Sequence, residues 1–203
     1  MWVPIALSRD VPPGTTRAVI SDGKEYVLWR GGDGSLQLWE DRCPHRGMRL
    51  SLGFVRGNAL NCLYHGWEYA AAAQCVRIPA HPDLAVPGTI KANVFTVIEA
   101  GAMIWTSDGS TDDPPMIAGA HPLCSLAIRA PSQAVIEAFG AETSRVTQSW
   151  ITRLAGFPLL IGWHAVDEAK TMLHAVLAGD GDARAATQML RDLRDRLEAE
   201  LVT

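Results

Sequence analysis

Two short runs of metal-ligating residue types constrain the fold of this chain more than any other feature. The first covers residues 43–47 and reads Cys-Pro-His-Arg-Gly, and the second covers residues 62–67 and reads Cys-Leu-Tyr-His-Gly-Trp. Together they form the pattern C-x-H, a gap of 16 residues, and C-x-x-H. If all four Cys and His side chains serve one centre, the residues between the runs must fold back so that the runs meet.

The candidate ligands are two cysteines and two histidines, namely Cys43, His45, Cys62 and His65. Two thiolates and two imidazoles can hold a [2Fe-2S] cluster asymmetrically, with both Cys on one iron and both His on the other, and the His ligands raise its reduction potential. Zinc is an alternative, although zinc sites usually combine C-x2-4-C with H-x3-5-H pairs. Chance is the other alternative, but it requires two matched Cys/His runs that both end near Gly. The pattern favours one iron–sulfur cluster per chain.

The residues that flank these four fit the same chemistry. Pro44, Gly47 and Gly66 allow tight loops that bring backbone N–H groups toward bridging sulfides. Hydrogen bonds of this kind stabilise the reduced, more negative cluster and raise its potential. A histidine ligand also keeps one ring nitrogen for solvent or a partner, so electron and proton transfer can be coupled.

Three stretches carry a specific resemblance. Residues 41–53, 61–69 and 74–80 resemble the first cluster loop, the second cluster loop and the following strand and turn of Rieske non-heme iron oxygenases. The likeness covers roughly residues 2–106, about half of the chain. Rieske proteins of respiratory complexes carry an extra Cys in each loop, and they place a Ser after the second His-Gly. This chain has Trp67 at that position, so we expect a potential in the lower part of the Rieske range.

The resemblance and the hydrophobic patterns together predict the domain organisation. We expect an all-β Rieske domain over residues 1–110, with antiparallel sheets and an inserted cluster-binding subdomain, and a linker over 111–121. Residues 122–203 are expected to form a small α+β domain that resembles a truncated helix-grip fold. Its predicted elements are strands over 123–129, 145–154, 158–166 and 170–177, a short helix over 134–139 and a long amphipathic helix over 183–201.

Composition limits the other partners. The chain has 203 residues, a net charge of −4 and no basic run, so neither nucleic acid nor an anionic membrane surface is indicated. It has no signal-peptide pattern and no stretch of 18 apolar residues, so we expect a cytoplasmic protein. Cys75 and Cys124 remain after the candidate ligands, and buried free thiols are the favoured interpretation over a disulfide.

The second iron of the oxygenases has no obvious counterpart. The resemblance implies two His in an H-x4-H pair and one carboxylate, and this chain has no such pair. His164 and His174 lie on predicted neighbouring strands, with Asp167 or Glu168 near the turn, and a facial triad is one interpretation. Ordinary sheet histidines are the favoured one. His81 is similarly favoured as a surface turn residue over an electron relay or docking residue.

The predicted function follows from the ligands and from the missing pair. We expect a Rieske electron-transfer protein or subunit that passes single electrons from a flavin or ferredoxin-type reductase to a non-heme iron oxygenase centre held elsewhere. A catalytic oxygenase subunit and homo- or hetero-oligomers are the expected partners, and no catalytic residue is assigned. A compact oxygenase that hydroxylates or demethylates an aromatic substrate at an atypical iron site is one alternative. A redox-sensing or scaffold protein is the other.

Overall fold

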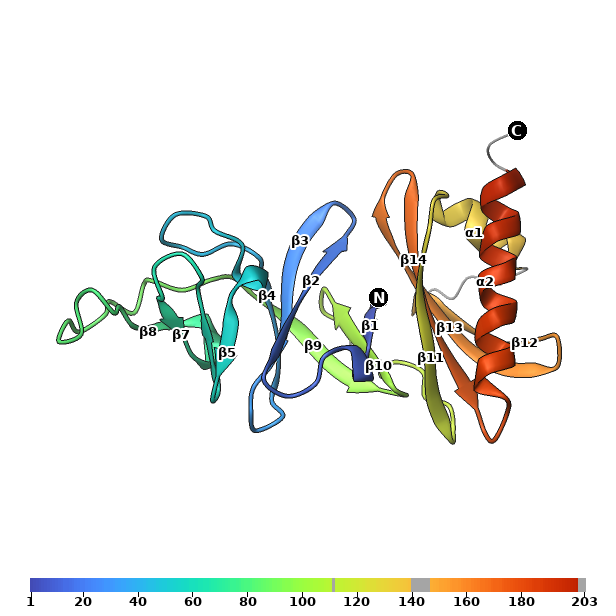
Figure 1. Cartoon of the computed structure of the whole chain (residues 1–203), viewed down its shortest axis with the longest axis horizontal. Helices are drawn as coiled ribbons and strands as arrows, with labels where there is room; N and C mark the ends of the chain where they lie inside the picture. The colour runs from blue at the N-terminus through green and yellow to red at the C-terminus, as the bar shows by residue number, and fades with distance from the viewer. Residues whose placement is uncertain (111, 140–146, 201–203) are drawn as a thin grey trace. The chain divides into compact units, whose positions relative to one another are not determined.

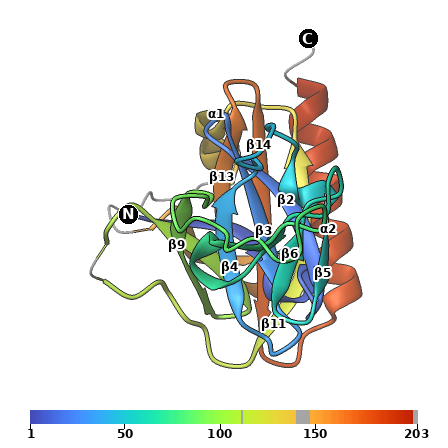
Figure 2. The ribbon, with the colours of Figure 1, turned by 90° about the vertical axis from the view of Figure 1, so that its left-hand side faces the viewer.

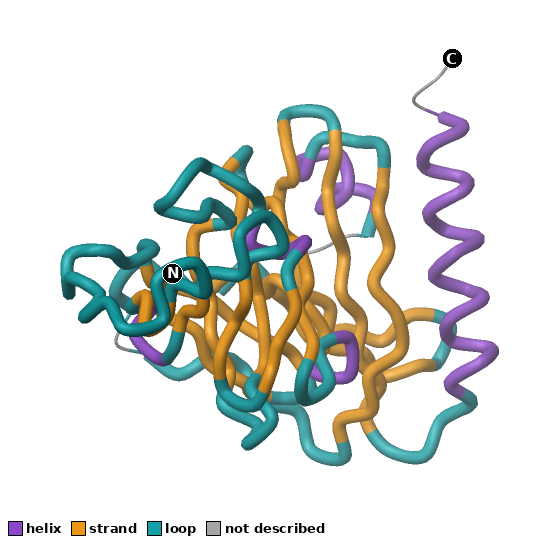
Figure 3. The backbone as a smooth tube through the Cα atoms, turned by 60° about the vertical axis from the view of Figure 1, so that its left-hand side comes forward, coloured by secondary structure: helices purple, strands orange, loops and turns teal. Residues whose placement is uncertain are grey.

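A computed structural model describes residues 1–110, 112–139 and 147–200. The chain forms two compact units, one of residues 11–20 and 24–97, and the other of residues 1–10, 21–23 and 98–203. Strands dominate both units, and most of the helical residues belong to one long helix near the C-terminus (Figure 3). No helix among the described residues is both long and apolar enough to cross a membrane.

The unit of residues 11–20 and 24–97, which we call the N-terminal unit, is built on an antiparallel sheet. Its strands are β2 (Thr15–Ser21), β3 (Lys24–Arg30), β4 (Leu36–Glu40) and the start of β9 (Val94–Ala100). They lie side by side in the order β2, β3, β4, β9 (Figure 2). Trp29 and Trp39 are fully buried and meet edge to face, with ring centroids 4.9 Å apart. These indoles fill the core beneath the two runs of candidate ligands.

A second, smaller sheet carries the two runs. Its strands are β5 (Phe54–Arg56), β6 (Ala59–Asn61), β7 (Glu68–Tyr69) and β8 (Cys75–Arg77), in that spatial order. The first run lies between β4 and β5, and the second run connects β6 to β7. The predicted insertion of a cluster-binding subdomain between strands of the base sheet is therefore present in the fold.

The other unit, which we call the C-terminal unit, contains a four-stranded antiparallel sheet and two helices. The strands are β11 (Ala120–Ile128), β12 (Ser149–Leu154), β13 (Phe157–Asp167) and β14 (Lys170–Ala178), in the order β11, β14, β13, β12. The helices are α1 (Ser132–Ala138) and α2 (Ala183–Glu200), and α2 lies along one face of this sheet (Figure 1). These elements match the predicted ones, although residues 145–146 and 201 lie outside the described residues.

Both faces of this sheet are covered. Apolar side chains of α2, including Ala186, Leu190 and Leu197, share one core with the strands. The opposite face packs against β1 (Trp2–Leu7) and β10 (Met103–Ser107), which pair with each other. A Cβ on Gly162 would lie 2.5 Å from Cγ of Pro4, so only glycine permits this approach of β1. The first strand of the chain therefore belongs to the C-terminal unit.

The predicted linker, residues 111–121, begins between β10 and β11 and ends inside β11. β10 ends at Ser107 and β11 begins at Ala120. The proposed limits at residues 110 and 121 stay a prediction, because the compact units divide the chain in a different way and include residues 1–10 with the C-terminal part.

One carboxylate joins α2 to the end of β11. Both oxygens of Glu198 accept hydrogen bonds from Arg129, Oε1 from its backbone N–H at 2.7 Å and Oε2 from its guanidinium at 3.0 and 3.1 Å. The backbone N–H of Arg129 is the main cause that lowers the pKa of Glu198 from 4.5, and the guanidinium adds to it.

We expect the substitution Glu198→Gln to lower the free energy of unfolding by about 1 kcal/mol at pH 7, a modest value because Arg129 is well exposed. A lowered folded-state pKa contributes stability above the unfolded-state value, and this contribution is lost as pH falls through the folded-state value. Urea unfolding of both proteins at several pH values from 7 to 3 measures this contribution to the free energy of unfolding. Asp180→Asn, in the exposed loop before α2, is the control, and equal losses at pH 3 and pH 7 would contradict the assignment.

Candidate metal centre

The two runs of candidate ligands fold into equivalent loops. In the first loop (residues 43–48) the N–H of Cys43 donates to Met48 O at 2.8 Å, and the N–H of Gly47 donates to Cys43 O at 2.8 Å. In the second loop (residues 62–67) the N–H of Cys62 donates to Trp67 O at 2.9 Å, and the N–H of Gly66 donates to Cys62 O at 2.9 Å. The two loops therefore have the same pair of backbone hydrogen bonds. They differ in the position of the histidine, which is two residues after the cysteine in the first loop and three residues after it in the second.

Glycine is required in both loops. Gly47 has a φ of 71° and Gly66 a φ of 67°, which are left-handed conformations that other residues adopt at a cost. Space is also restricted, since a Cβ at Gly66 would lie 3.2 Å from Cγ of Pro79. The sequence analysis expected tight loops from these glycines, and that expectation is confirmed.

The four candidate ligands come together as two pairs. Cys43 and Cys62 are each 2% exposed and belong to the apolar core of the unit. Burial raises the pKa of the Cys62 thiol and the nearby Cys43 adds to this, whereas the backbone N–H groups of Tyr64 and His65 act in the opposite direction. His45 is partly exposed and His65 is exposed, and their ring centroids lie 4.7 Å apart. Burial, followed by the charges of His65 and Arg46, lowers the pKa of His45.

Aromatic side chains hold the imidazoles in place. Trp67 of the second loop stacks on His45 of the first loop, with centroids 4.2 Å apart and an interplanar angle of 5°. Tyr64 lies against His65, with ring centroids 3.8 Å apart. The indole thus links the two loops, and it occupies the position where the respiratory-type loop has a serine.

Tyr69 is a site residue that the sequence analysis did not assign. It is fully buried at the end of β7, and its hydroxyl lies 3.1 Å from Sγ of Cys43. Burial is the main cause that raises its pKa far above the ordinary value of 10.0, so the phenol keeps its proton. It is therefore a hydrogen-bond donor toward Cys43 whenever that sulfur is a thiolate. A tyrosine two residues beyond Trp67 in the quoted motif was the available signal.

Two contacts stabilise the ends of the first loop. The carboxylate of Asp41 accepts hydrogen bonds from the backbone N–H of Ser51 at 2.6 Å and from its hydroxyl at 2.5 Å. Asp41 precedes the loop and Ser51 follows it, so this contact closes its base. Gly53 lies directly against β6, and a Cβ there would stand 2.2 Å from the carbonyl oxygen of Asn61.

We expect Gly53→Ala to destabilise the N-terminal unit by about 3 kcal/mol, because backbone atoms on both sides leave no room for a methyl group. The φ of Gly53 is −77°, so the effect is steric and not conformational. Gly88→Ala is the matched control, since the nearest atom to its Cβ would be Oε1 of Gln74 at 3.9 Å. Chemical denaturation measures both, and a loss at Gly53 no larger than at Gly88 would contradict the close packing.

The donor arrangement fits a two-iron cluster. Among the residues that the structure describes, no three His, Cys, Asp or Glu side chains group tightly enough to hold one metal ion. The four candidate ligands instead form a buried thiol pair and a surface imidazole pair, which is the division that a Rieske-type cluster needs. A tetrahedral zinc site would need all four donors around one ion.

His164 and His174 lie elsewhere, in the C-terminal unit. They are 2% and 1% exposed, and their ring centroids lie 5.3 Å apart at an interplanar angle of 25°. Nδ1 of His164 lies 2.8 Å from Pro4 O, and Nδ1 of His174 lies 2.8 Å from Oγ of Ser125. Within the described residues no third metal-ligating side chain joins them. The described residues thus lend no support to a facial triad of this pair, and both histidines lie on the paired strands β13 and β14, where the favoured interpretation puts them.

The acidic residues considered for the facial triad lie in an exposed turn, and the two cysteines that are not candidate ligands are buried. Asp167 and Glu168 are exposed, and Oδ1 of Asp167 accepts the backbone N–H of Ala169 at 2.9 Å. Cys75 and Cys124 are buried free thiols, as expected.

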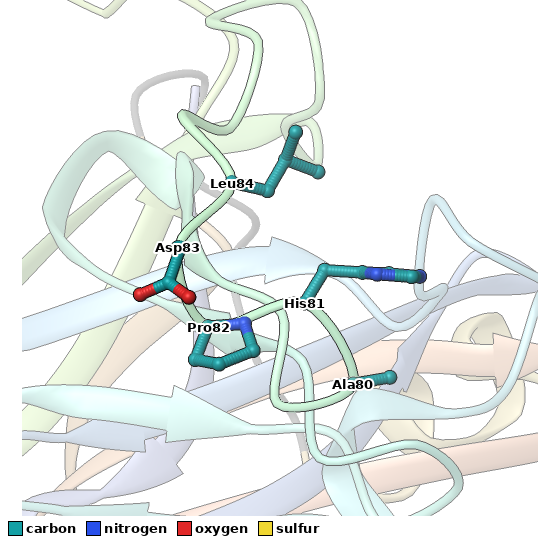
Figure 4. A pocket seen from close by; sticks show the side chains of 5 residues that line it. All are labelled: Ala80, His81, Pro82, Asp83 and Leu84. Carbon is teal, nitrogen blue, oxygen red and sulfur yellow. The ribbon is translucent and has the colours of Figure 1, made fainter.

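His81 lies in an exposed turn that, with residues 80 and 82–84, lines an open hollow of about 550 Å³. Its imidazole and the carboxylate of Asp83 point in different directions (Figure 4). All residues that line the hollow are consecutive, so it is the concave side of one turn. The interpretation of His81 as a surface turn histidine fits this position.

Comparisons with known proteins match the part of the chain that carries the two loops. Residues 1–99 match the family model of the Rieske [2Fe-2S] domain. The chain is 41% identical over 116 residues to oxidoreductase NdmD of Pseudomonas putida, covering 57% of this chain and 20% of that protein. It is 36% identical over 113 residues to methylxanthine N1-demethylase NdmA of the same species, covering 54% and 29%. The chain thus spans only a fifth to about a third of the curated relatives it matches.

The likeness in fold extends over both units. A solved structure of Pseudomonas putida NdmA superposes with a TM-score of 0.77 at 20% identity, covering 100% of this chain and 80% of that one. The expected order of an all-β Rieske domain followed by a small α+β domain resembling a truncated helix-grip fold is confirmed. The N-terminal half of this chain is a Rieske [2Fe-2S] domain of the type found in Rieske non-heme iron oxygenases.

Proposed function

We propose that this chain is a Rieske electron-transfer protein or subunit that passes single electrons from a flavin or ferredoxin-type reductase to a non-heme iron oxygenase centre held elsewhere. In this proposal Cys43 and Cys62 hold one iron, and His45 and His65 hold the other. The observation that carries it is the pairing of two buried thiols with two surface imidazoles on equivalent loops. The bound cluster supplies reversible one-electron transfer.

The surrounding residues set the conditions for that transfer. Burial of both thiols excludes water from one side of the centre, and Tyr69 stabilises negative charge on the Cys43 sulfur by donating its proton to a hydrogen bond. The imidazoles lie at the surface, so electrons have their shortest path to a partner on that side. Trp67 and Tyr64 hold the two rings in fixed orientations.

The C-terminal unit supports the placement of the second iron in another protein. Its buried histidines hydrogen-bond to Pro4 and Ser125, and their sheet is packed on both faces. This arrangement supports a structural or docking role for the unit. Two relatives are named as an oxidoreductase and as a demethylase, and these names support partners of the reductase and oxygenase classes.

Metal analysis tests the proposal. The purified protein, reconstituted with iron and sulfide, is expected to hold two irons and two sulfides per chain and to show the electron paramagnetic resonance signal of a reduced Rieske cluster. Further Fe(II) is not expected to bind. A third iron that binds tightly and consumes oxygen on reduction would favour the compact oxygenase, and the absence of a Rieske signal would overturn both.

A further inference from the structure

The two units differ sharply in charge. The N-terminal unit, with the cluster loops, contains nine Lys and Arg against six Asp and Glu, a net charge of +3. The C-terminal unit contains nine against sixteen, a net charge of −7. The net charge of −4 for the whole chain is therefore the sum of a cationic unit, which carries the candidate redox site, and an anionic unit. Surface charge of one sign steers association with partners of the opposite sign.

Three of these cations surround the first loop. Arg42, Arg46 and Lys91 are exposed, and we call them the cationic face. Arg46 directly follows His45 in the first loop. The guanidinium of Arg42 lies over Gly47, with Nε 3.3 Å from the position of a Cβ there.

The cationic face differs from its neighbours because, among the residues that the structure describes, no carboxylate forms an ion pair with it. Two nearby arginines are paired, Arg49 with Glu25 and Arg77 with Glu68. Among the ion pairs between described residues, none includes a member of the cationic face. Their charges are therefore directed to solvent or to a partner.

A hollow lies within this face. It has a volume of about 210 Å³ and is lined by Arg42, Lys91, Glu40 and Asn93, together with Cys43, Pro44, Gly47 and Ala92. The amide of Asn93 donates to Oε2 of Glu40 at 2.7 Å, so this carboxylate is engaged by a neutral group. The volume is several times the share of about 30 Å³ that one water takes in the liquid. A carboxylate side chain of a partner fits its size and its charge.

Apolar side chains complete the surface on the side of the second loop. Leu63 is 57% exposed and Tyr64 is 55% exposed, and Tyr64 lies against His65. Exposed apolar groups beside a charged rim are typical of protein interfaces.

We propose that the cationic face is the docking surface for an acidic electron-transfer protein, which inserts an Asp or Glu side chain into the hollow between Arg42 and Lys91. This inference rests on the proposed function and specifies the chemistry of its partner. One electron moves from the reduced partner to the oxidised cluster, and no bond forms or breaks. The contact places the partner against the loop that carries His45.

Stopped-flow reduction tests the docking surface. Reduced plant-type ferredoxin, an acidic protein of much lower potential than a Rieske cluster, is mixed with the oxidised holoprotein, and bleaching of the visible cluster absorbance is followed. We expect the rate constant to fall about tenfold or more as ionic strength rises from about 0.01 M to about 1 M, where the Debye length shrinks from about 30 Å to about 3 Å. Arg46→Glu and Lys91→Glu are expected to lower the low-salt rate about tenfold each.

Arg56→Glu is the matched control, because Arg56 carries the same charge in the same unit but lies at the β5–β6 turn, over the ring of Phe54. It is expected to change the rate by less than about twofold. Tyr69→Phe controls for driving force, since it is expected to lower the cluster potential without changing the charge. The reduction potential of the cluster is measured in each variant, so that a slower rate caused by a smaller driving force is distinguished from one caused by weaker docking.

The outcomes separate the two proposals. Fast reduction that is independent of salt, or an equal effect of Arg56→Glu, would overturn the docking surface and leave the electron-transfer function intact. A cluster that dithionite reduces but ferredoxin does not, at any salt concentration, would count against both. Salt-sensitive self-association in sedimentation that Arg46→Glu abolishes, with an unchanged ferredoxin rate, would make a second copy of this chain the occupant and overturn the acidic partner.

Discussion

Replacing Cys62 by serine is expected to remove nearly all bound iron and sulfide from the protein. A serine hydroxyl is not ionised at neutral pH and is a poor ligand for iron in a sulfide cluster, so one iron would lose half of its protein ligands. Burial already raises the pKa of the Cys62 thiol, so in the proposed site a bound cluster would be needed to keep this sulfur a thiolate. Visible absorbance, iron content and electron paramagnetic resonance of the reconstituted protein measure the loss.

Cys75 is the matched control within the same core. It is 1% exposed and packs in one apolar cluster with Cys43 and Cys62, yet its sulfur contacts the carbonyl of Arg77 at 3.7 Å. Cys75→Ser is expected to keep the full iron content. If both variants retain iron, Cys62 is not a ligand. If both lose it, burial of the thiols and not their position decides cluster assembly.

The second large effect concerns the reduction potential. Tyr69→Phe is expected to lower it by about 40 mV, which corresponds to about 1 kcal/mol for one electron. The phenol hydroxyl, 3.1 Å from Sγ of Cys43, donates to a sulfur that becomes more electron-rich on reduction. This hydrogen bond stabilises the reduced form more than the oxidised form, so its removal disfavours reduction. Redox titration followed by circular dichroism or visible absorbance measures the shift.

Tyr64→Phe provides the comparison. Tyr64 also lies beside a candidate ligand, but it touches His65 through its ring and is 55% exposed. Loss of its hydroxyl is expected to leave the potential unchanged. A similar shift in both variants would mean that general polarity around the cluster, and not the bond to Cys43, sets the potential.

Trp67 and Tyr69 act on the potential in opposite senses. The indole stands where a serine would donate a hydrogen bond, which supports a lower potential, whereas the phenol supplies one donor from two residues further along. We therefore still expect a reduction potential in the lower part of the Rieske range, although the hydrogen bond from Tyr69 keeps it higher than it would be without this donor.

The sequence predicted the class of cluster and the two tight loops because their determinants are local. Cys43 and His45 stand two residues apart, Cys62 and His65 three residues apart, and Gly47 and Gly66 close the two loops that present them. The periodic patterns behind β13, β14 and α2 are equally local, so they also predicted those elements. The role of Tyr69 was missed, since its partner Cys43 is 26 residues away.

The environment of the histidine pair in the C-terminal unit depends on distant contacts. His164 hydrogen-bonds to Pro4, which is 160 residues away, and Ser125 stands 49 residues from His174. No pattern in the sequence distinguishes such a pair from a metal site, because the number of side chains that converge on it depends on which strands pack together.

The sequence by itself determined the class of cluster and the two tight loops, and it predicted the ligand types, because each of these depends on residues within a few positions of one another. The tertiary structure decided which strands form the C-terminal unit, since β1 joins it through packing against Gly162 and Leu160. It also decided that the thiols are buried while the imidazoles remain at the surface. Burial and long-range pairing are properties of the whole packed chain, so only the folded structure contains them.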